Sequence, residues 1–126
     1  MRRDKITPSE DGEQEAVCQW MDILNITYMH IPNEGKRSPA AAALLKKIGL
    51  KPGFPDLFIL EPRNGYHGLA VEMKRIGGRV SENQWIWIHR LNSKGYVARV
   101  CYGADEAIAL IKKYLTGQGE FNGNKT

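Results

Sequence analysis

The spacing of apolar side chains along the 126 residues predicts helices and strands that succeed one another through the chain. The segment TPSE at residues 7–10 has the form of a capping box with proline at the first helical position. We therefore expect a helix to begin near Thr7. Its apolar face consists of Val17, Trp20, Met21 and Leu24. Runs rich in apolar and β-branched residues predict strands at residues 26–31, 57–60, 69–74 and 96–101.

Further helices are expected at residues 40–48, from Ser81 to about residue 92, and at residues 103–115. The order of these elements predicts an α/β protein in which helices flank a central mixed β-sheet. Between two of the strands, Asn64 and Gly65 form an Asn-Gly pair, which is a strong signal for a β-hairpin. We therefore expect residues 57–60 and 69–74 to lie side by side and antiparallel.

The hairpin has a geometric consequence for its charged residues. If it is symmetric about Asn64, Asp56 lies opposite Glu72, and facing side chains in an antiparallel pair have Cβ atoms about 4.5–5.5 Å apart. Lys74 is two residues beyond Glu72 and therefore points to the same face of the sheet. The apolar residues that alternate with them are expected on the opposite face: Leu57, Ile59, Val71 and Met73.

Two carboxylates that face each other repel, which destabilises a sheet unless a cation lies between them. Mg²⁺ and Mn²⁺ favour oxygen ligands, so Asp56 and Glu72 suit such an ion, with the backbone carbonyl of Met73 as a further candidate. A divalent ion activates water and neutralises a phosphoryl group, while Lys74 suits the orientation of that water. These groups suit phosphodiester hydrolysis. The alternative is that Lys74 simply pairs with both acids.

Composition limits the number of domains and the classes of protein to which the chain can belong. With 42% hydrophobic and 25% charged residues, we expect a single domain over residues 1–126, with its core at about 9–115 and a flexible tail at 116–126. No apolar run reaches membrane-spanning length, and the N-terminal segment is unlike a secretory signal. Cys18 and Cys101 lack metal-binding spacing, which favours two buried, reduced thiols in an intracellular protein. The net charge of +4 favours a polyanionic partner such as nucleic acid.

The charged hairpin residues also match a known signature. Pro55-Asp56, followed on the next predicted strand by Glu72-Met73-Lys74, resembles the motif of PD-(D/E)xK nucleases. The segments GLKPGFPDLFIL, YHGLAVEMKR, GGRVSENQWIWIHRL and GYVARVCYGADEAIALIKKYL resemble the VRR-NUC family, the virus-type replication-repair nucleases, in its stand-alone phage form. The resemblance extends from about residue 10 to about residue 115. It implies a restriction-endonuclease-like core and a nuclease that depends on Mg²⁺ or Mn²⁺.

The resemblance also implies roles for individual residues. Asp56 and Glu72 match the metal ligands of the family, and Lys74 matches the catalytic lysine. Gln84 matches a glutamine that lies beside the active site and is therefore a further catalytic candidate. Because Gln84 stands three residues after Ser81, where a capping box takes glutamine, helix capping explains it equally well.

Two further groups of candidates come from the same resemblance. The family often has a metal-proximal glutamate in the first helix, and Gln14 or Glu13 stands there, with an ordinary polar surface role as the alternative. Candidate DNA contacts are Asn33, Lys36, Arg37, Arg75 and Arg79, with solvated loops as the alternative. An exposed Trp87 would stack on a base or be buried in a dimer contact.

We therefore expect a homodimeric endodeoxyribonuclease that uses Mg²⁺ or Mn²⁺ and hydrolyses phosphodiester bonds in branched DNA such as Holliday junctions. Stand-alone members of the family are similar to archaeal Holliday junction resolvases, which implies this substrate, and a symmetric dimer presents two sites to two strands. No membrane and no small-molecule cofactor are expected. We expect a phage or prophage origin and the cytoplasm of a bacterial host. The alternatives are a nuclease that cuts duplex or flap DNA with a targeting partner, and a non-catalytic nucleic-acid-binding module.

Overall fold

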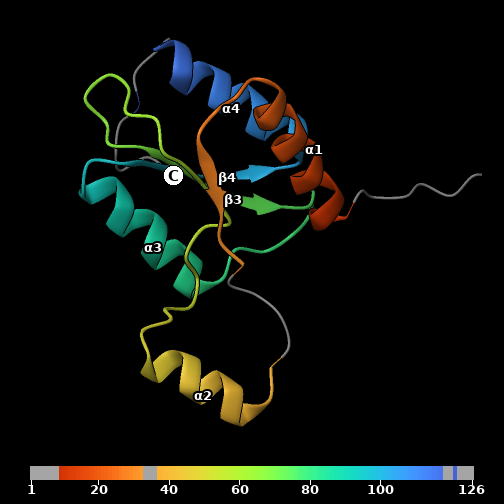
Figure 1. Ribbon diagram of the computed structural model, residues 1–126, viewed down its shortest axis with the longest axis vertical. Helices are drawn as coiled ribbons and strands as arrows, with labels where there is room; N and C mark the ends of the chain where they lie inside the picture. Colours follow the sequence, from red (N-terminus) through yellow and green to blue (C-terminus); the bar gives the residue numbers. More distant parts are fainter. Residues whose placement is uncertain (1–8, 33–36, 118–120, 122–126) are drawn as a thin grey trace, which may run out of the picture.

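The computed structural model describes residues 9–32, 37–117 and 121. Its elements in chain order are α1 (Glu10–Ile23), β1 (Tyr28–His30), α2 (Pro39–Lys47), β2 (Leu57–Ile59), β3 (Leu69–Lys74), α3 (Glu82–Ser93), β4 (Val97–Tyr102) and α4 (Ala104–Thr116) (Figure 1). The order and type of these elements agree with the pattern of the sequence, and β3 has the predicted bounds.

The strands form one sheet in the order β1-β2-β3-β4. β1 and β2 pair antiparallel, as do β2 and β3, whereas β3 and β4 are parallel and are connected through α3. Helices α1 and α4 cover one face of this sheet and α3 covers the other, while α2 lies apart from it (Figure 1). The predicted α/β class, a mixed sheet flanked by helices, is therefore confirmed.

An Asn-Gly turn connects the two strands of the central hairpin. Asn64 and Gly65 have φ values of 49° and 83°, the left-handed backbone that a two-residue hairpin turn requires. Arg63 and Tyr66 on either side exchange both backbone hydrogen bonds, at 3.2 and 2.8 Å. Leu57 pairs with Val71, which is the register predicted from symmetry about Asn64. The Arg63–Tyr66 bridge is one residue out of step with this register, so residues 60–62 lie opposite residues 67–68 between the turn and the paired strands.

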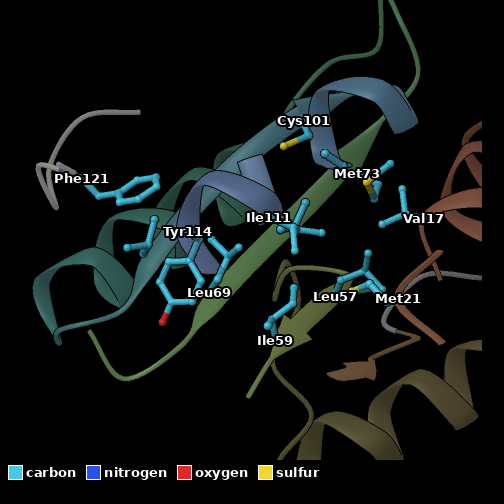
Figure 2. Packing of buried hydrophobic residues seen from close by; sticks show 13 residues of the cluster. Val17, Met21, Leu57, Ile59, Leu69, Met73, Cys101, Ile111, Tyr114 and Phe121 are labelled. Carbon is cyan, nitrogen blue, oxygen red and sulfur yellow. The ribbon is translucent and has the colours of Figure 1, made fainter. Parts of the chain in front are cut away.

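The larger core cluster lies between the sheet and the helices α1 and α4 (Figure 2). The sheet contributes Leu57, Ile59, Leu69, Val71, Met73, Val97 and Cys101 to it, and the helices contribute Val17, Met21, Ala107, Ile111 and Tyr114. The apolar hairpin residues that were expected on one face are all in this cluster. The charged hairpin residues therefore point to the other face, toward α3.

On the α3 face, small side chains on the sheet allow the helix to approach closely. Ala70 and Ala98 pack there against Ile88 and Leu91 of α3. β4 is an edge strand, and Asn92 of α3 covers its outer edge. Its side-chain Nδ2 donates to the carbonyl of Ala98 at 3.1 Å, and its Oδ1 accepts from the N–H of Ala98 at 2.9 Å. One buried amide thus replaces the missing neighbouring strand at this point.

The ends of several elements differ from the expectation. α1 has Ser9 as its N-cap, and its hydroxyl accepts from the N–H of Gly12 at 3.0 Å, whereas the predicted start at Thr7 lies outside the described residues. Leu24 is exposed because it is the C-cap of α1, beyond the last packed turn. Phe121 falls in the predicted flexible tail, yet it is buried against Tyr66 and Tyr114.

The two thiols are in different environments. Cys101 lies on β4 and is buried in the larger core cluster, and this burial raises its pKa to about 12. Cys18 is only half-buried, so the expectation of two buried thiols holds for Cys101 alone, although burial also raises the pKa of Cys18. Both cysteines are free. Within the described ranges, no helix is both long and apolar enough to span a membrane.

We predict that Asn92→Ala lowers the free energy of unfolding by about 2–4 kcal/mol, because it leaves both buried backbone groups of Ala98 without the Asn92 amide. Urea unfolding followed by circular dichroism measures this loss. Ser93→Ala, at an exposed neighbouring position of α3, is the control. A loss no larger than that of Ser93→Ala would contradict the role assigned to Asn92.

Candidate active site

The candidate site includes two charged residues on β3, the most buried strand of the sheet. All six residues of β3 are buried, and they include Glu72 with 1% and Lys74 with 7% of their surface exposed. Charged side chains are rarely buried unless they are paired, because removing an ion from water is costly. β3 therefore needs partners for these two residues on the α3 side of the sheet.

Asp56 directly precedes β2, and the register of the hairpin places it beside Glu72. Extending the Leu57–Val71 register by one position sets Asp56 opposite Glu72. The side-chain Oδ2 of Asp56 accepts a hydrogen bond from the N–H of Met73 at 2.9 Å, in the place where a further β2 residue would pair. The carbonyl of Asp56 accepts from the N–H of Ile31 at 2.8 Å, which ties this residue to the end of β1.

The backbone carbonyl of Met73 points to the same side as Asp56. Along a strand, successive residues direct their N–H and C=O groups alternately to the two neighbouring strands. The carbonyl of Lys74 accepts from the N–H of Gly103, at the end of β4, at 3.0 Å. The N–H and C=O groups of Met73 therefore both point away from β4, toward β2. The hydrogen bond from this N–H to Asp56 agrees with that direction.

Glu72 has partners from two elements. Its Oε2 atom is 3.7 Å from the ammonium nitrogen of Lys74 and accepts a hydrogen bond from Nε2 of Gln84 at 3.1 Å. Both contacts offset part of the cost of burying this side chain. A positive group on its own strand and an amide from α3 thus hold one oxygen atom of Glu72 in place.

Gln84 caps α3 and also contacts Glu72. Its Oε1 atom accepts from the N–H of Ser81 at 2.8 Å, while the hydroxyl of Ser81 accepts from the N–H of Gln84 at 3.2 Å. This reciprocal pair is the predicted capping box at the start of α3. The cap fixes the orientation of the amide, because its oxygen is bound to Ser81 and its NH₂ group is left facing Glu72.

A cleft of about 200 Å³ opens over these groups. Its lining consists of Pro52, Gly53, Phe54, Asp56, Glu72, Ser81, Asn83 and Gln84. Gly53 closes one side of the cleft by direct backbone contact with α3. It has a φ of 90°, and a Cβ atom there would lie 2.6 Å from the backbone carbonyl carbon of Asn83. Glycine is therefore required at this position by both conformation and space.

Aromatic side chains support the wall of the cleft. The Phe54 ring lies edge-on to Trp87 of α3, with centroids 5.1 Å apart, and 6.0 Å from the ring of Phe58. The guanidinium of Arg90 lies 5.5 Å from the centroid of Trp87. Trp87 is half-buried in this cluster, which differs from the exposed position considered for it. Sequence spacing did not indicate this support, because Phe54 is in a turn and Trp87 is on a distant helix.

The first-helix candidates lie outside the cleft. The carboxylate of Glu13 accepts a hydrogen bond from the N–H of Ala104. It thus caps α4, whose own N-cap residue, Gly103, has no side chain. Gln14 is nearer to the site, because its amide contacts the ring of His30 at 2.7 Å, and Nδ1 of His30 lies 3.1 Å from the carbonyl of Asp56.

The candidate DNA-binding residues that the structure describes are exposed and do not line the cleft. Arg75 and Arg79 are exposed in the connection from β3 to α3. Arg37 lies in a second cavity at the base of α2, together with Pro52, which also lines the cleft. Asn33 and Lys36 lie outside the described residues.

The donor set of the cleft fits a small, hard divalent cation. Asp56 and Glu72 supply carboxylate oxygens and Met73 a carbonyl oxygen directed to the same side. Over the described ranges, no group of three or more His, Cys, Asp or Glu side chains is arranged to hold a metal. Two protein carboxylates are the number that Mg²⁺ commonly uses, with water or substrate oxygens as its other ligands.

The mixed sheet, its flanking helices and the paired carboxylates with a lysine define an α/β protein with a nuclease-type core. The family model of the VRR-NUC domain matches residues 4–105. A solved structure described as a VRR_NUC domain protein is 31% identical, with a TM-score of 0.74, and the match covers 96% of this chain and 98% of that one. No curated protein sequence matches. The chain belongs to the VRR-NUC family, whose domain is a nuclease domain and implies DNA as its substrate.

A pair of substitutions separates the two roles of Gln84. Ser81→Ala removes capping alone and is expected to lower the free energy of unfolding by about 1 kcal/mol. Gln84→Ala also removes the donor to a buried carboxylate, so we expect a further loss of about 1.5–3 kcal/mol. Urea titration of both variants measures the difference. Equal losses would mean that Gln84 serves only as a cap.

Proposed function

We propose that the protein is a metal-dependent DNA endonuclease. The observation that carries this proposal is the convergence of Asp56 and Glu72 in one cleft, with the ammonium group of Lys74 3.7 Å from Glu72. Two buried acids with one lysine are a costly arrangement for stability alone. They suit a reaction in which charge on a phosphate must be neutralised.

Asp56, Glu72 and the carbonyl of Met73 are the groups that would hold the divalent ion. When bound, Mg²⁺ or Mn²⁺ supplies Lewis acidity toward a phosphate oxygen and lowers the pKa of water. The hydrogen bond from Met73 to Asp56 and that from Gln84 to Glu72 fix the two carboxylates before substrate arrives. Such preorganisation avoids rearrangement during the reaction.

Lys74 and Gln84 have complementary roles in this proposal. The ammonium group of Lys74 compensates Glu72 in the free protein and stabilises negative charge on the phosphate as water attacks. The amide of Gln84 keeps Glu72 oriented through the capping box of α3, so it is a positioning residue. Arg75, Arg79 and Arg37 would hold the DNA backbone without reading its sequence.

We also propose that the protein works as a homodimer on branched DNA. Support comes from the part of the sheet that α3 leaves uncovered. Met29 faces Phe58 across β1 and β2, and Leu60 follows on the same face. Met29 and Leu60 are 58% and 50% exposed, an unusual state for large apolar side chains beside one another on a sheet. Covering this face with a second copy would present two clefts to two strands of a junction.

The dimer proposal predicts a mass of twice the 14.2 kDa chain in sedimentation equilibrium at micromolar concentration. Met29→Lys together with Leu60→Lys is expected to give the monomer, because charged side chains resist burial in an apolar contact. Ile23→Lys is the control, since Ile23 is also exposed but lies on α1, across the sheet. A wild-type monomer, or dissociation by Ile23→Lys alone, would contradict the assignment of this face.

The nuclease proposal predicts that Asp56→Asn and Glu72→Gln abolish metal-dependent cleavage while they preserve the shape of each side chain. Lys74→Met is expected to slow cleavage by at least about 100-fold, the effect of removing one preorganised charge from a reaction centre. Asp105→Asn, an exposed carboxylate on α4, should cleave like the wild type.

Labelled four-way junction, flap and duplex DNA with Mg²⁺, Mn²⁺ or EDTA provide the assay. Paired, symmetric cuts on the junction alone would support the proposed substrate, and cuts in flap or duplex DNA would favour a nuclease that needs a targeting partner. Binding without cleavage under every condition would leave the non-catalytic module. Full activity of Asp56→Asn combined with Glu72→Gln would refute the proposed site.

A further inference from the structure

Helix α2 has features that the core of the protein does not explain. None of its nine residues is buried, and it projects beyond the lower end of the sheet (Figure 1). Isolated helices of this length are marginal in water. α2 nevertheless has a complete set of local signals. The hydroxyl of Ser38 accepts from the N–H of Ala41 at 3.1 Å, Pro39 begins the helix, and Lys46 and Lys47 lie in its last turn.

A second cavity of about 200 Å³ lies where α2 joins the body. It is lined by Arg37, Ala42, Lys46, Leu50 and Pro52. Ala42 and Lys46 are four residues apart and share one face of the helix. Lys47 is turned by about 100° from Lys46 and is not part of the lining.

The composition of this cavity identifies a class of ligand. Among the residues that the structure describes, the charged residues that line this cavity are Arg37 and Lys46, both cations, and none of the lining residues is acidic. Over residues 9–32, 37–117 and 121, neither cation forms an ion pair with a carboxylate. Ala42, Leu50 and Pro52 provide an apolar floor. Two cations over such a floor suit a phosphodiester whose sugar packs on the apolar side.

The cavity is also in the right place for a polymer that enters the active site. Pro52 lines both this cavity and the cleft that contains Asp56 and Glu72. The chain between Pro52 and Asp56 is short and is held against α3 by the contact of Gly53 with Asn83. A nucleic-acid strand in the cleft therefore reaches the α2 cavity without leaving the protein surface.

We propose that the α2 cavity binds a backbone phosphate of DNA outside the cleft, with Arg37 and Lys46 as its ligands. This inference rests on the proposed nuclease function and extends it from the scissile phosphate to a second contact point. It also explains the exposed position of α2, because a helix that contacts DNA outside the cleft must extend beyond the core.

Fluorescence anisotropy with a labelled DNA junction in EDTA, measured from low to high salt, tests the proposal without cleavage. Arg37→Ala combined with Lys46→Ala is expected to weaken binding by at least about tenfold at 0.1 M salt. It should also reduce the slope of log K against log salt by about 1 for each phosphate that the variant no longer binds. Lys47→Ala combined with Lys94→Ala removes the same charge from exposed positions outside the cavity and serves as the matched control. We expect it to change the affinity less than threefold.

Lys46→Arg keeps a cation in the cavity and should retain the wild-type salt slope, which excludes a merely structural effect of the alanine change. Circular dichroism checks that every variant retains its helices. Equal slopes for the cavity and control variants would overturn the α2 site, while Mg²⁺-dependent cleavage by the wild type would leave the nuclease proposal standing. Absence of wild-type cleavage on every DNA would instead refute the nuclease proposal itself.

Discussion

The hydrogen bond from the N–H of Met73 to the side chain of Asp56 is the interaction on which the candidate site depends. β2 begins at Leu57, so the backbone ladder with β3 stops just before Asp56. The carboxylate takes over the next position of the ladder. An acidic side chain is thereby held at the end of the strand pair, where it meets Glu72 and not solvent. Without this bond, Asp56 would belong to a turn whose direction β3 does not control.

The buried charge of Glu72 connects the sheet to α3. Lys74 and Gln84 reach the same carboxylate oxygen, one from β3 and the other from the first turn of α3. Because the amide of Gln84 is oriented by Ser81, the local signal that starts the helix also determines the geometry of the site. The approach of Gly53 to Asn83 brings the preceding turn against the same helical turn. The first turn of α3 therefore positions both the wall of the cleft and the carboxylate of Glu72.

Two acids, Asp56 and Glu72, are buried in the cleft, where a cation would compensate them. The basic residues Arg75, Arg79, Arg37 and Lys46 are exposed. A polyanion approaching this surface is attracted by the outer charges before it meets the carboxylates. The family assignment gives this arrangement its meaning, since a nuclease domain must hold a phosphate backbone while it keeps negative groups close to the reacting bond.

The sequence by itself determined the elements, the Asn-Gly turn and the capping box, because each depends on residues close together in the chain. Asn64 and Gly65 fix the turn, and period-two alternation sets Glu72 and Lys74 on one face. The one-residue offset between the turn and the paired strands, which brings Asp56 opposite Glu72, belongs to the folded sheet. Only the tertiary structure decided which distant groups complete the site. Glu13 was a candidate ligand by position, but the packing of α1 on α4 directs it to a helix N-terminus that lacks its own cap. The cavity beside α2 and the aromatic wall of the cleft likewise join residues from separate elements, and no local spacing encodes the distance between elements that meet only when the sheet and helices pack.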